Sequence, residues 1–361
     1  MLFRSGASVY IPYKQTSADY PDVSWEKTIM KNIGLDFSVL GDRISGSFDY
    51  FVNDVTDRLG YANTAALSPL STRPINGSHI QRYGWDATLN TVNIQRPNLR
   101  WTSILTFSRY TAIWKERMPG FDFNNYQIRE NEPTSISYFY RAGELLKSDL
   151  SNCPSSQPEG FRVPGTPIII DLNGDGTITK EDIDHRTGFP KLYWGFGNTL
   201  TWKNWDLDIF MYSQLGVVKY NNSWSWASGS GLANQTSNAS TMIYQIYNSE
   251  TNPNGVRQGI GTSLITANLP ENVGTDYGYE DASFVRVRNI TLGYNFSSQT
   301  LRKLGNVFTG LKIYFDTQNP FTFSKYGPLD PEVNTSSGGK GRSGSNYPMT
   351  RQFSLGVKAS F

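Results

Sequence analysis

Apolar and polar residues alternate one by one along much of this chain. In the segment 205–212, apolar side chains occupy positions 205, 207, 209 and 211, and Asp206 and Asp208 stand between them. A period of two places the apolar side chains on one face of a β-strand, and helical periodicity is scarce. Nine segments show the pattern, namely 33–39, 44–52, 85–90, 99–107, 194–202, 205–212, 290–296, 311–316 and 353–361. The sequence therefore predicts an all-β chain of about nine strands.

The connections between these segments alternate between short and long. Gly41-Asp42 and Lys203-Asn204 read as tight hairpin turns, and 93–98 and 297–310 are also short. Turn and breaker residues mark the long connections as 53–83, 110–190, 213–283 and 324–346. Short turns on one side and long loops on the other are typical of outer-membrane barrels. The predicted fold is an antiparallel transmembrane β-barrel segment, a partial barrel with long extracellular loops.

Composition and net charge exclude several classes of protein. Apolar residues make up 38% of the 361 residues, mean hydropathy is -0.45, and no run of eighteen apolar residues occurs, which excludes a helical membrane protein. A net charge of +2 gives no electrostatic case for nucleic acid as a partner. One cysteine, Cys153, excludes an internal disulfide framework.

Four stretches carry a resemblance to a known family. They are WEKTIMKNIGLDFSVLGDRISGSFDYFVNDVTDRL at 25–59, YGWDATLN at 83–90, DLNGDGTITKEDIDHRTGFPKLYWGFGNTLTWKNWDLDIFMYSQLG at 171–216, and ASFVRVRNITLGYNF at 282–296 leading to TQNPFTFSKYGPLDPE at 317–332. Together they resemble the carboxy-terminal part of a SusC/RagA-type TonB-linked outer-membrane transporter of the Bacteroidetes. The resemblance covers nearly the whole chain, in the family's order.

The resemblance implies a function in nutrient uptake rather than an enzyme. It implies a barrel of about 22 strands with an amino-terminal plug. It also implies import of glycans or peptides, a SusD-like lipoprotein over the extracellular loops, contact with outer-membrane lipid, and coupling to TonB through the missing amino-terminal part. Residues 1–361 would be the carboxy-terminal portion of that barrel, and 110–190 one long extracellular loop. Nine strands do not close so wide a barrel, so we expect a fragment that lacks the sequence upstream of Met1 and does not transport alone.

The stretch DLNGDGTITKED matches the spacing of a twelve-residue calcium loop. Asp171, Asn173 and Asp175 fall at positions 1, 3 and 5, Thr177 would offer its carbonyl, and Asp182 takes position 12. Hard cations bind such oxygen ligands on a tight turn. Asp in place of Glu at the last position departs from the usual pattern. A loop of Asx turns without a metal is the alternative, and calcium as a cofactor is a hypothesis.

Tryptophan and arginine positions give two further expectations. Trp224 and Trp226 lie in a long connection, where they are candidates for stacking on a sugar, whereas Trp202 and Trp205 flank a short turn and suit an interfacial girdle. Arg286 and Arg288 share the parity of the apolar positions that follow them. Either they lie beyond the apolar band, or a β-bulge switches the face.

One other class of function fits the all-β pattern. The chain could be a secreted calcium- and carbohydrate-binding module or a glycan hydrolase. A hydrolase needs a pair of carboxylates across a cleft, and the sequence identifies none. The strand faces distinguish the classes, because a barrel turns its apolar side to lipid in a continuous belt.

Overall fold

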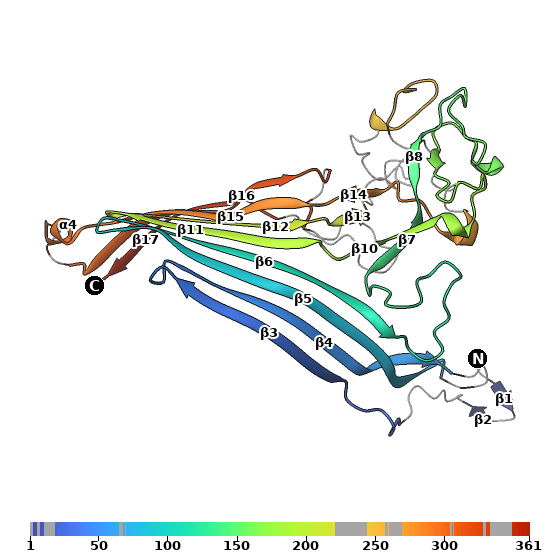
Figure 1. Cartoon of the computed structure of the whole chain (residues 1–361), viewed down its shortest axis with the longest axis horizontal. Coiled ribbons are helices and arrows are strands. Elements are labelled where there is room, and N and C mark those ends of the chain that lie inside the picture. The colour runs from blue at the N-terminus through green and yellow to red at the C-terminus, as the bar shows by residue number, and fades with distance from the viewer. Residues whose placement is uncertain are drawn as a thin grey trace. The chain divides into compact units, whose positions relative to one another are not determined.

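The structure is a computed structural model of the 361-residue chain (Figure 1). It describes residues 3–5, 8–10, 19–64, 68, 70–220, 244–256, 259, 269–303, 305, 307–327, 330–332 and 349–361. No helix in this described part is long and apolar enough to cross a membrane.

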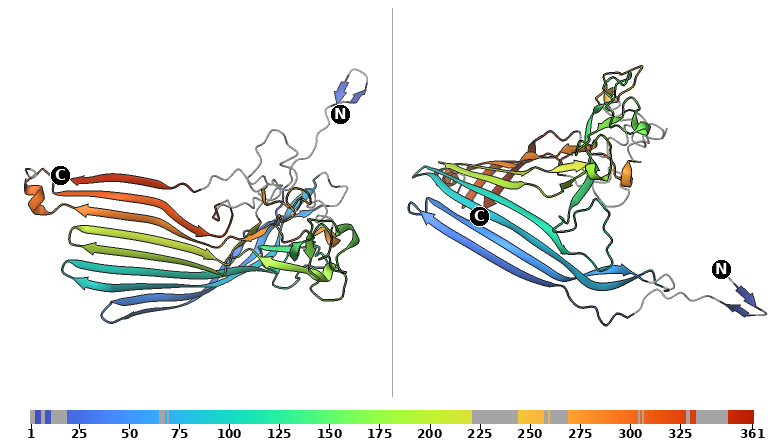
Figure 2. Two further views of the ribbon diagram at one scale, coloured as in Figure 1. Left: turned by 90° about the horizontal axis from the view of Figure 1, so that it is seen from above. Right: turned by 45° about the vertical axis from the view of Figure 1, so that its right-hand side comes forward.

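Nine strands form one sheet in which each strand lies beside its neighbour in the sequence. The order is β17-β16-β15-β12-β11-β6-β5-β4-β3, so no connection crosses over another strand (Figures 1 and 2). The strands are β3 (Lys27–Val39), β4 (Ile44–Asn63), β5 (Thr72–Arg96), β6 (Leu99–Glu116), β11 (Leu192–Trp202), β12 (Trp205–Leu215), β15 (Phe284–Asn295), β16 (Gly310–Ser324) and β17 (Gln352–Ser360). Seven of the nine predicted segments lie wholly within these strands, and the other two, 290–296 and 353–361, extend one residue past β15 and β17, so the antiparallel nine-stranded fold is confirmed.

The register keeps the two faces of the sheet distinct. Leu200, Leu207, Leu292, Phe315 and Leu355 stand side by side across five strands. The next positions along the same strands form a polar row, Thr199, Asp208, Thr291, Asp316 and Ser354. Because successive side chains of a strand point to opposite faces, one face is apolar and the other polar. Leu292, Phe315 and Leu355 are 41%, 44% and 78% exposed, so nothing within the described chain covers the apolar face at these positions.

The short turns follow from their residues. Leu40, Gly41 and Asp42 all adopt positive φ, at 56°, 61° and 63°, in the hairpin between β3 and β4. Glycine and aspartate tolerate that left-handed region better than most residues. Lys203, with φ 53°, closes the hairpin between β11 and β12.

A β-bulge at Arg288 decides where the two arginines of β15 point. The pairing with β12 passes from Phe210 with Asn289 to Met211 with Val287, which leaves Arg288 as the extra residue. Beyond the bulge, Arg286 stands opposite Tyr212 on the polar face. Of the two expectations for these arginines, the switch of face is therefore the one observed for Arg286.

The predicted long connection at 53–83 is wrong. Strand β4 continues to Asn63 and β5 begins at Thr72, so only residues 64–71 connect them. Gly, Pro and Asp in this region suggested a loop, but the strands accommodate them, with Asp57 at φ 52° and Gly77 at φ 155°. Pairing with a neighbouring strand decides strand length more than local propensity does. Likewise β6 runs to Glu116, so the next connection spans 117–191.

The chain forms two compact units. One comprises Met1–Asn32, Phe51–Tyr83 and Thr111–Thr134, and the other comprises Ile33–Tyr50, Gly84–Tyr110 and Ser135–Phe361. In the first unit, Arg117 pairs with the buried carboxylate of Glu132. The guanidinium carbon of Arg117 also lies 4.5 Å from the ring centroid of Trp114.

Two long connections of the second unit pack into a loop layer, which we define as residues 135–187 and 269–281. It contains β7 (Ile136–Tyr140), β8 (Ala142–Leu145), β9 (Pro167–Ile169), β10 (Ile183–Thr187) and β14 (Tyr279–Asp281), with β13 (Val218–Tyr220) paired to β14. The backbone N–H of Tyr140 donates to the carbonyl of Gly274 over 3.0 Å, and the carbonyl of Tyr140 accepts from the backbone N–H of Asp276 over 3.0 Å. Phe139, Leu146, Ile169 and Leu269 are at most 1% exposed, so the layer has its own apolar core.

The remaining elements are short. Strands β1 (Phe3–Ser5) and β2 (Ser8–Tyr10) form a two-stranded sheet. The 3-10 helices are η1 (Glu159–Phe161), η2 (Lys180–Asp182) and η4 (Pro270–Asn272). One α-helical turn, α4 (Ser298–Lys303), lies between β15 and β16 and carries Arg302 and Lys303 at its end.

Candidate functional site

The polar face of the sheet is held together by side-chain hydrogen bonds between neighbouring strands. Thr199 Oγ1 donates to Asp208 Oδ1 over 2.7 Å, and Thr291 Oγ1 donates to Asp316 Oδ1 over 2.6 Å. Both pairs stand directly opposite in the register, where side chains of the same face meet. This face therefore presents a continuous polar wall rather than an apolar core.

Asp206 on β12 links its strand to β15 and β16 within this wall. Its Oδ2 lies 2.7 Å from Lys312 Nζ on β16, and its Oδ1 accepts from Asn295 Nδ2 on β15 over 2.6 Å. A Cβ at Gly293, which stands opposite Asp206, would lie only 2.5 Å from Asp206 Oδ2. The absence of a side chain at Gly293 thus leaves room for the ion pair across three strands.

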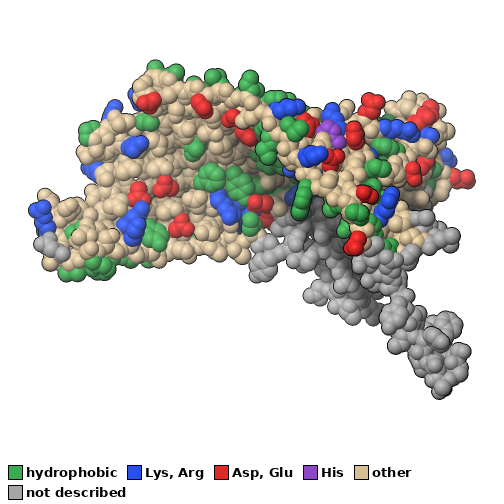
Figure 3. Space-filling model, turned by 90° about the horizontal axis from the view of Figure 1, so that it is seen from below, with side chains coloured by type: hydrophobic (Ala, Val, Ile, Leu, Met, Phe, Trp, Pro, Cys, Tyr) green, Lys and Arg blue, Asp and Glu red, His purple; other side chains and the backbone are tan. Residues whose placement is uncertain are grey.

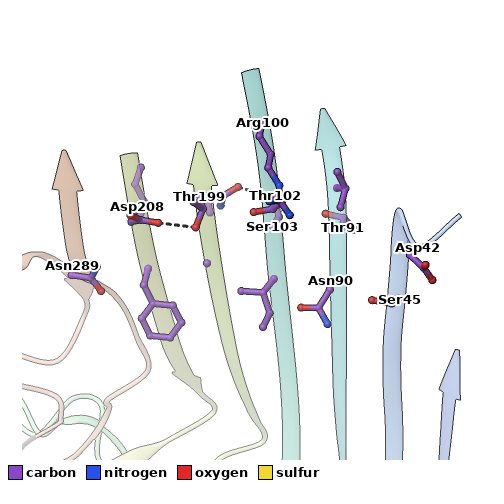
Figure 4. A pocket seen from close by; sticks show the side chains of 16 residues that line it. Asp42, Ser45, Asn90, Thr91, Arg100, Thr102, Ser103, Thr199, Asp208 and Asn289 are labelled. Carbon is purple, nitrogen blue, oxygen red and sulfur yellow. Dashed lines mark hydrogen bonds between the residues drawn. The ribbon is translucent and has the colours of Figure 1, made fainter. Parts of the chain in front are cut away.

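A cavity of about 510 Å³ opens on the polar face (Figure 4). Asn90, Arg100 and Asn289 line it, and none of their side chains makes a hydrogen bond or ion pair with another described residue. Phe210 supplies an apolar wall to it and is 39% exposed. A Cβ at Gly195 would make an ordinary contact of 3.6 Å with this ring but would lie only 2.7 Å from Thr106 Oγ1, so the glycine leaves room for the Thr106 side chain. Unpaired polar groups beside an aromatic ring can bind a polar, uncharged or weakly charged ligand.

The distribution of charged side chains on the surface favours neither an anionic nor a cationic ligand. Figure 3 shows Lys and Arg interspersed with Asp and Glu over the face that it presents, without a large area of one sign. This distribution agrees with the net charge of +2. Recognition by shape and hydrogen bonds fits such a surface better than long-range steering does.

A buried ionic cluster holds the start of the β16–β17 connection to the polar face. Arg286 is 1% exposed, and its guanidinium lies 2.6 Å from Asp330 Oδ1 and 3.6 Å from Glu332 Oε2. Tyr212 on β12 donates a short hydrogen bond to the same Glu332 carboxylate. Lys219 donates to the carbonyl of Pro331 over 2.5 Å. Arg286 and Asp330 lie in separate stretches of the chain, and nothing in the sequence shows that they meet.

The predicted calcium-loop residues all lie in the loop layer, in one tight loop. Asp171 accepts from the backbone N–H of Gly174 over 2.7 Å and of Gly176 over 2.8 Å. Asp182 is fully buried, and its carboxylate accepts from the N–H of Leu172 and of Thr179, each over 2.8 Å. The carboxylates thus point inward and are bonded to the loop's own backbone.

Asp175 binds its neighbours within the same loop. Its Oδ1 accepts from Thr177 N and Thr177 Oγ1, each over 2.8 Å, and its Oδ2 accepts from Asn173 Nδ2 over 3.0 Å. These hydrogen bonds, led by the Thr177 hydroxyl, lower the pKa of the Asp175 carboxyl. Within the described residues, no three side chains of His, Cys, Asp or Glu lie together as metal ligands would. The loop offers Asn173 and the Thr177 carbonyl as further oxygen donors, so the calcium hypothesis stays a prediction.

The tryptophans divide as follows. Trp224 and Trp226 lie outside the described residues, so their sugar-binding role remains a prediction. Trp202 and Trp205 stand opposite each other beside the hairpin turn, on the apolar face, and are 51% and 43% exposed. The ring of Trp205 meets that of Tyr294 edge to face at 4.8 Å. This arrangement is consistent with the interfacial girdle expected from the sequence, which stays a prediction.

One polar cluster on the apolar face was not expected from the sequence. Asn198, in register with Ile209, accepts from Trp101 Nε1 over 2.9 Å and from Ser103 Oγ over 2.7 Å. Ser103 in turn accepts from Asn93 over 2.7 Å. Mutual hydrogen bonding lowers the cost of placing these groups against hydrocarbon.

Comparison with known proteins gives consistent results. The chain is 26% identical over 364 residues to TonB-dependent receptor P3 of Formosa agariphila, covering 94% of this chain and 34% of that protein. It is 25% identical over 365 residues to TonB-dependent receptor SusC of Bacteroides thetaiotaomicron, covering 98% of this chain and 34% of that protein. The chain thus spans about a third of the length of these relatives. No protein-family model matches it.

Solved structures show the same fold. The RagAB peptide transporter matches with a TM-score of 0.72 at 20% identity, over 100% of this chain and 38% of that chain. The RagAB peptide importer in its open-open state matches with a TM-score of 0.71 at 21% identity. By name, each of these relatives and neighbours is a receptor, transporter or importer, which agrees with the prediction that the chain is not an enzyme.

Proposed function

We propose that this chain, which is related to the TonB-dependent receptors of the SusC type, forms part of the β-barrel wall of a nutrient transporter. Its location is the bacterial outer membrane, as predicted from the sequence. In this role the apolar face meets lipid and the polar face lines the interior.

The observation that carries the proposal is the two-faced sheet. A row of apolar side chains crosses five strands on one face and is exposed on β15, β16 and β17, and a polar row with hydrogen bonds between its members crosses the same strands on the other face. A soluble sandwich would bury the apolar rows against a second layer. A membrane-spanning wall leaves them exposed to lipid and turns its polar face to a water-filled or protein-filled interior.

The two edges of the sheet support a larger barrel. All thirteen residues of β3 are exposed, and eight of the nine residues of β17 are exposed. Unpaired strand edges are costly in lipid, because their backbone groups find no water there. We propose that further strands of a longer protein pair with β3 and β17, and that the chain alone does not transport.

In this proposal, the substrate and the partners are inferred from those of the related proteins. The names SusC and RagAB peptide transporter support import of a glycan or a peptide. Energy would come from TonB through parts of the protein outside this chain, and a SusD-like lipoprotein would cover the loop layer. The cavity with Asn90, Arg100 and Asn289 lies on the interior wall in this arrangement, along the path of a polar substrate.

A calcium ion in the loop 171–182 is a further part of the proposal. The donor set of carboxylate, amide and carbonyl oxygens suits a hard cation, and each carboxylate already holds the loop closed through backbone N–H groups. The ion would stabilise this loop within the loop layer, without taking part in transport itself.

Adjacent cysteines on β17 test the membrane-wall assignment. In a Cys153→Ser background, Leu355→Cys and Ser354→Cys are each expressed in the full protein and probed in isolated outer membranes. We expect a water-soluble, charged maleimide to modify Ser354→Cys and not Leu355→Cys, and only a lipid-soluble one to reach Leu355→Cys, since the two side chains take opposite faces. Equal labelling of both positions by the charged reagent would contradict the proposal.

A further inference from the structure

An apolar groove of about 340 Å³ lies on the membrane-facing side of the sheet near its short turns. Two neighbouring register rows line it. Trp205, Tyr294 and Ile313 form the row nearer the turns, and Leu292, Phe315 and Leu355 the row above it. Tyr314, whose register belongs to the polar face, also borders the groove, and the other lining side chains are hydrocarbon apart from the Tyr294 hydroxyl and the Trp205 ring N–H.

The groove ends at an aromatic rim. Trp205 packs edge to face against Tyr294 at 4.8 Å, and Tyr294 against Phe296 at 5.2 Å. Aromatic side chains with one polar end prefer the level of the lipid headgroups. The rim therefore marks where the hydrocarbon interior gives way to the headgroup layer.

Positive charge gathers at the connections beside that rim. Lys203, in the hairpin before β12, places its Nζ 5.4 Å from the centroid of the Trp202 ring. Arg302 and Lys303 end α4, between β15 and β16, and both are exposed. The connection 296–309 contains no acidic residue. None of the three cations forms an ion pair within the described part of the chain, so each is available to an anion.

We propose that this groove binds one phospholipid of the periplasm-facing leaflet. An acyl chain occupies the apolar rows, and the phosphate lies among Lys203, Arg302 and Lys303. The inference rests on the proposed membrane-wall function, and it goes beyond it by assigning a specific lipid site. Charge complementarity favours a phospholipid over a second protein, because an apolar trough beneath a cationic rim matches one lipid's tail and head.

Native mass spectrometry tests the site. The protein, extracted from outer membranes in a mild detergent and delipidated, is titrated with phosphatidylglycerol. We expect one lipid to be retained, and each of Lys203→Gln, Arg302→Gln and Lys303→Gln to weaken retention about fivefold. Leu292→Trp, which fills the groove, should abolish retention while leaving the cations in place. Lys27→Gln on β3, an exposed cation away from the groove, and Ile33→Trp, an exposed apolar position on the same strand, are the matched controls.

The outcomes separate the lipid site from the broader function. Unchanged retention in both the cation variants and Leu292→Trp would overturn the site, as would equal losses in Lys27→Gln or Ile33→Trp. If inorganic phosphate alone displaced the lipid and Leu292→Trp had no effect, the site would be a phosphate contact only, and the proposed lipid site would also be overturned. Normal alternating labelling of β17 together with no lipid retention would reject the lipid site and leave the membrane wall standing.

Discussion

Arg286 and Asp330 form a buried ion pair across 44 residues of sequence, with the guanidinium 2.6 Å from Asp330 Oδ1 and Arg286 only 1% exposed. Through this pair, β15 fixes the position of the segment that leads away from β16. The pair lies on the polar face only because the bulge at Arg288 turns Arg286 there.

Breaking the pair should destabilise the protein strongly. Arg286→Met removes the guanidinium that pairs with Asp330 and Glu332 and leaves Lys219 as the remaining cation beside them, which should cost up to about 3–5 kcal/mol. The measurement is thermal unfolding of the detergent-extracted protein, monitored on gels through the change in mobility that accompanies unfolding of the barrel. Lys27→Met, which removes an exposed pair with Asp57, should change stability by about 1 kcal/mol or less. Equal effects of the two variants would show that the cluster does not hold the connection.

Deleting Arg288 should be far worse than replacing it. Without the extra residue, the four residues from Phe284 to Val287 would exchange faces, and Arg286 would turn to the apolar face, where a cation costs up to about 2–4 kcal/mol at the membrane midplane and less toward the ends of the strands. We expect little outer-membrane protein from the deletion and near-normal yield from Arg288→Ala, which keeps the residue count. Quantitative immunoblotting of outer-membrane fractions gives the answer, and equal yields would mean that the bulge does not set the register.

A calorimetric titration tests whether the 171–182 loop binds calcium. Titration of the chelator-treated protein should give a binding heat that Asp175→Ala removes, because the variant loses an oxygen donor at position 5 of the loop. Asp149→Ala, an exposed carboxylate in the same long connection, is the matched control and should retain the heat. No heat in the unaltered protein would favour a loop closed by Asx turns alone.

Acid should loosen the same loop through Asp175. The Thr177 hydroxyl and N–H and the Asn173 amide lower the pKa of Asp175 in the folded state. Its contribution to stability is therefore present above the unfolded pKa and is lost as the pH falls through the lower, folded pKa. Thr177→Val removes the hydroxyl, the largest cause, so it should raise the pKa of Asp175. An NMR titration in the presence of chelator measures the shift, and Thr177→Ser should keep the lowered value. An unaltered pKa in Thr177→Val would contradict the assignment.

The sequence by itself determined the nine strands, their order and which face is apolar. The reason is local: period-2 alternation assigns each side chain to a face, and tight turns such as Gly41-Asp42 make successive strands neighbours. The tight, locally bonded 171–182 loop could also be read from spacing alone, because its hydrogen bonds join residues close in sequence, whereas calcium binding there stays a prediction.

Only the tertiary structure decided the features that depend on distant partners. Residues 53–63 and 72–83 are strands because neighbouring strands pair with them, although their Gly, Pro and Asp residues favour turns. The parity of Arg286 and Arg288 left a bulge as one of two possibilities, and only the shift of register against β12 and β16 places the bulge at Arg288. The burial of Arg286 against Asp330 and the hydrogen bonds of Asn198 to Trp101 and Ser103 likewise join residues far apart in the chain. A period of two assigns a side chain to a face, but pairing between strands sets where that period slips and which polar groups satisfy each other.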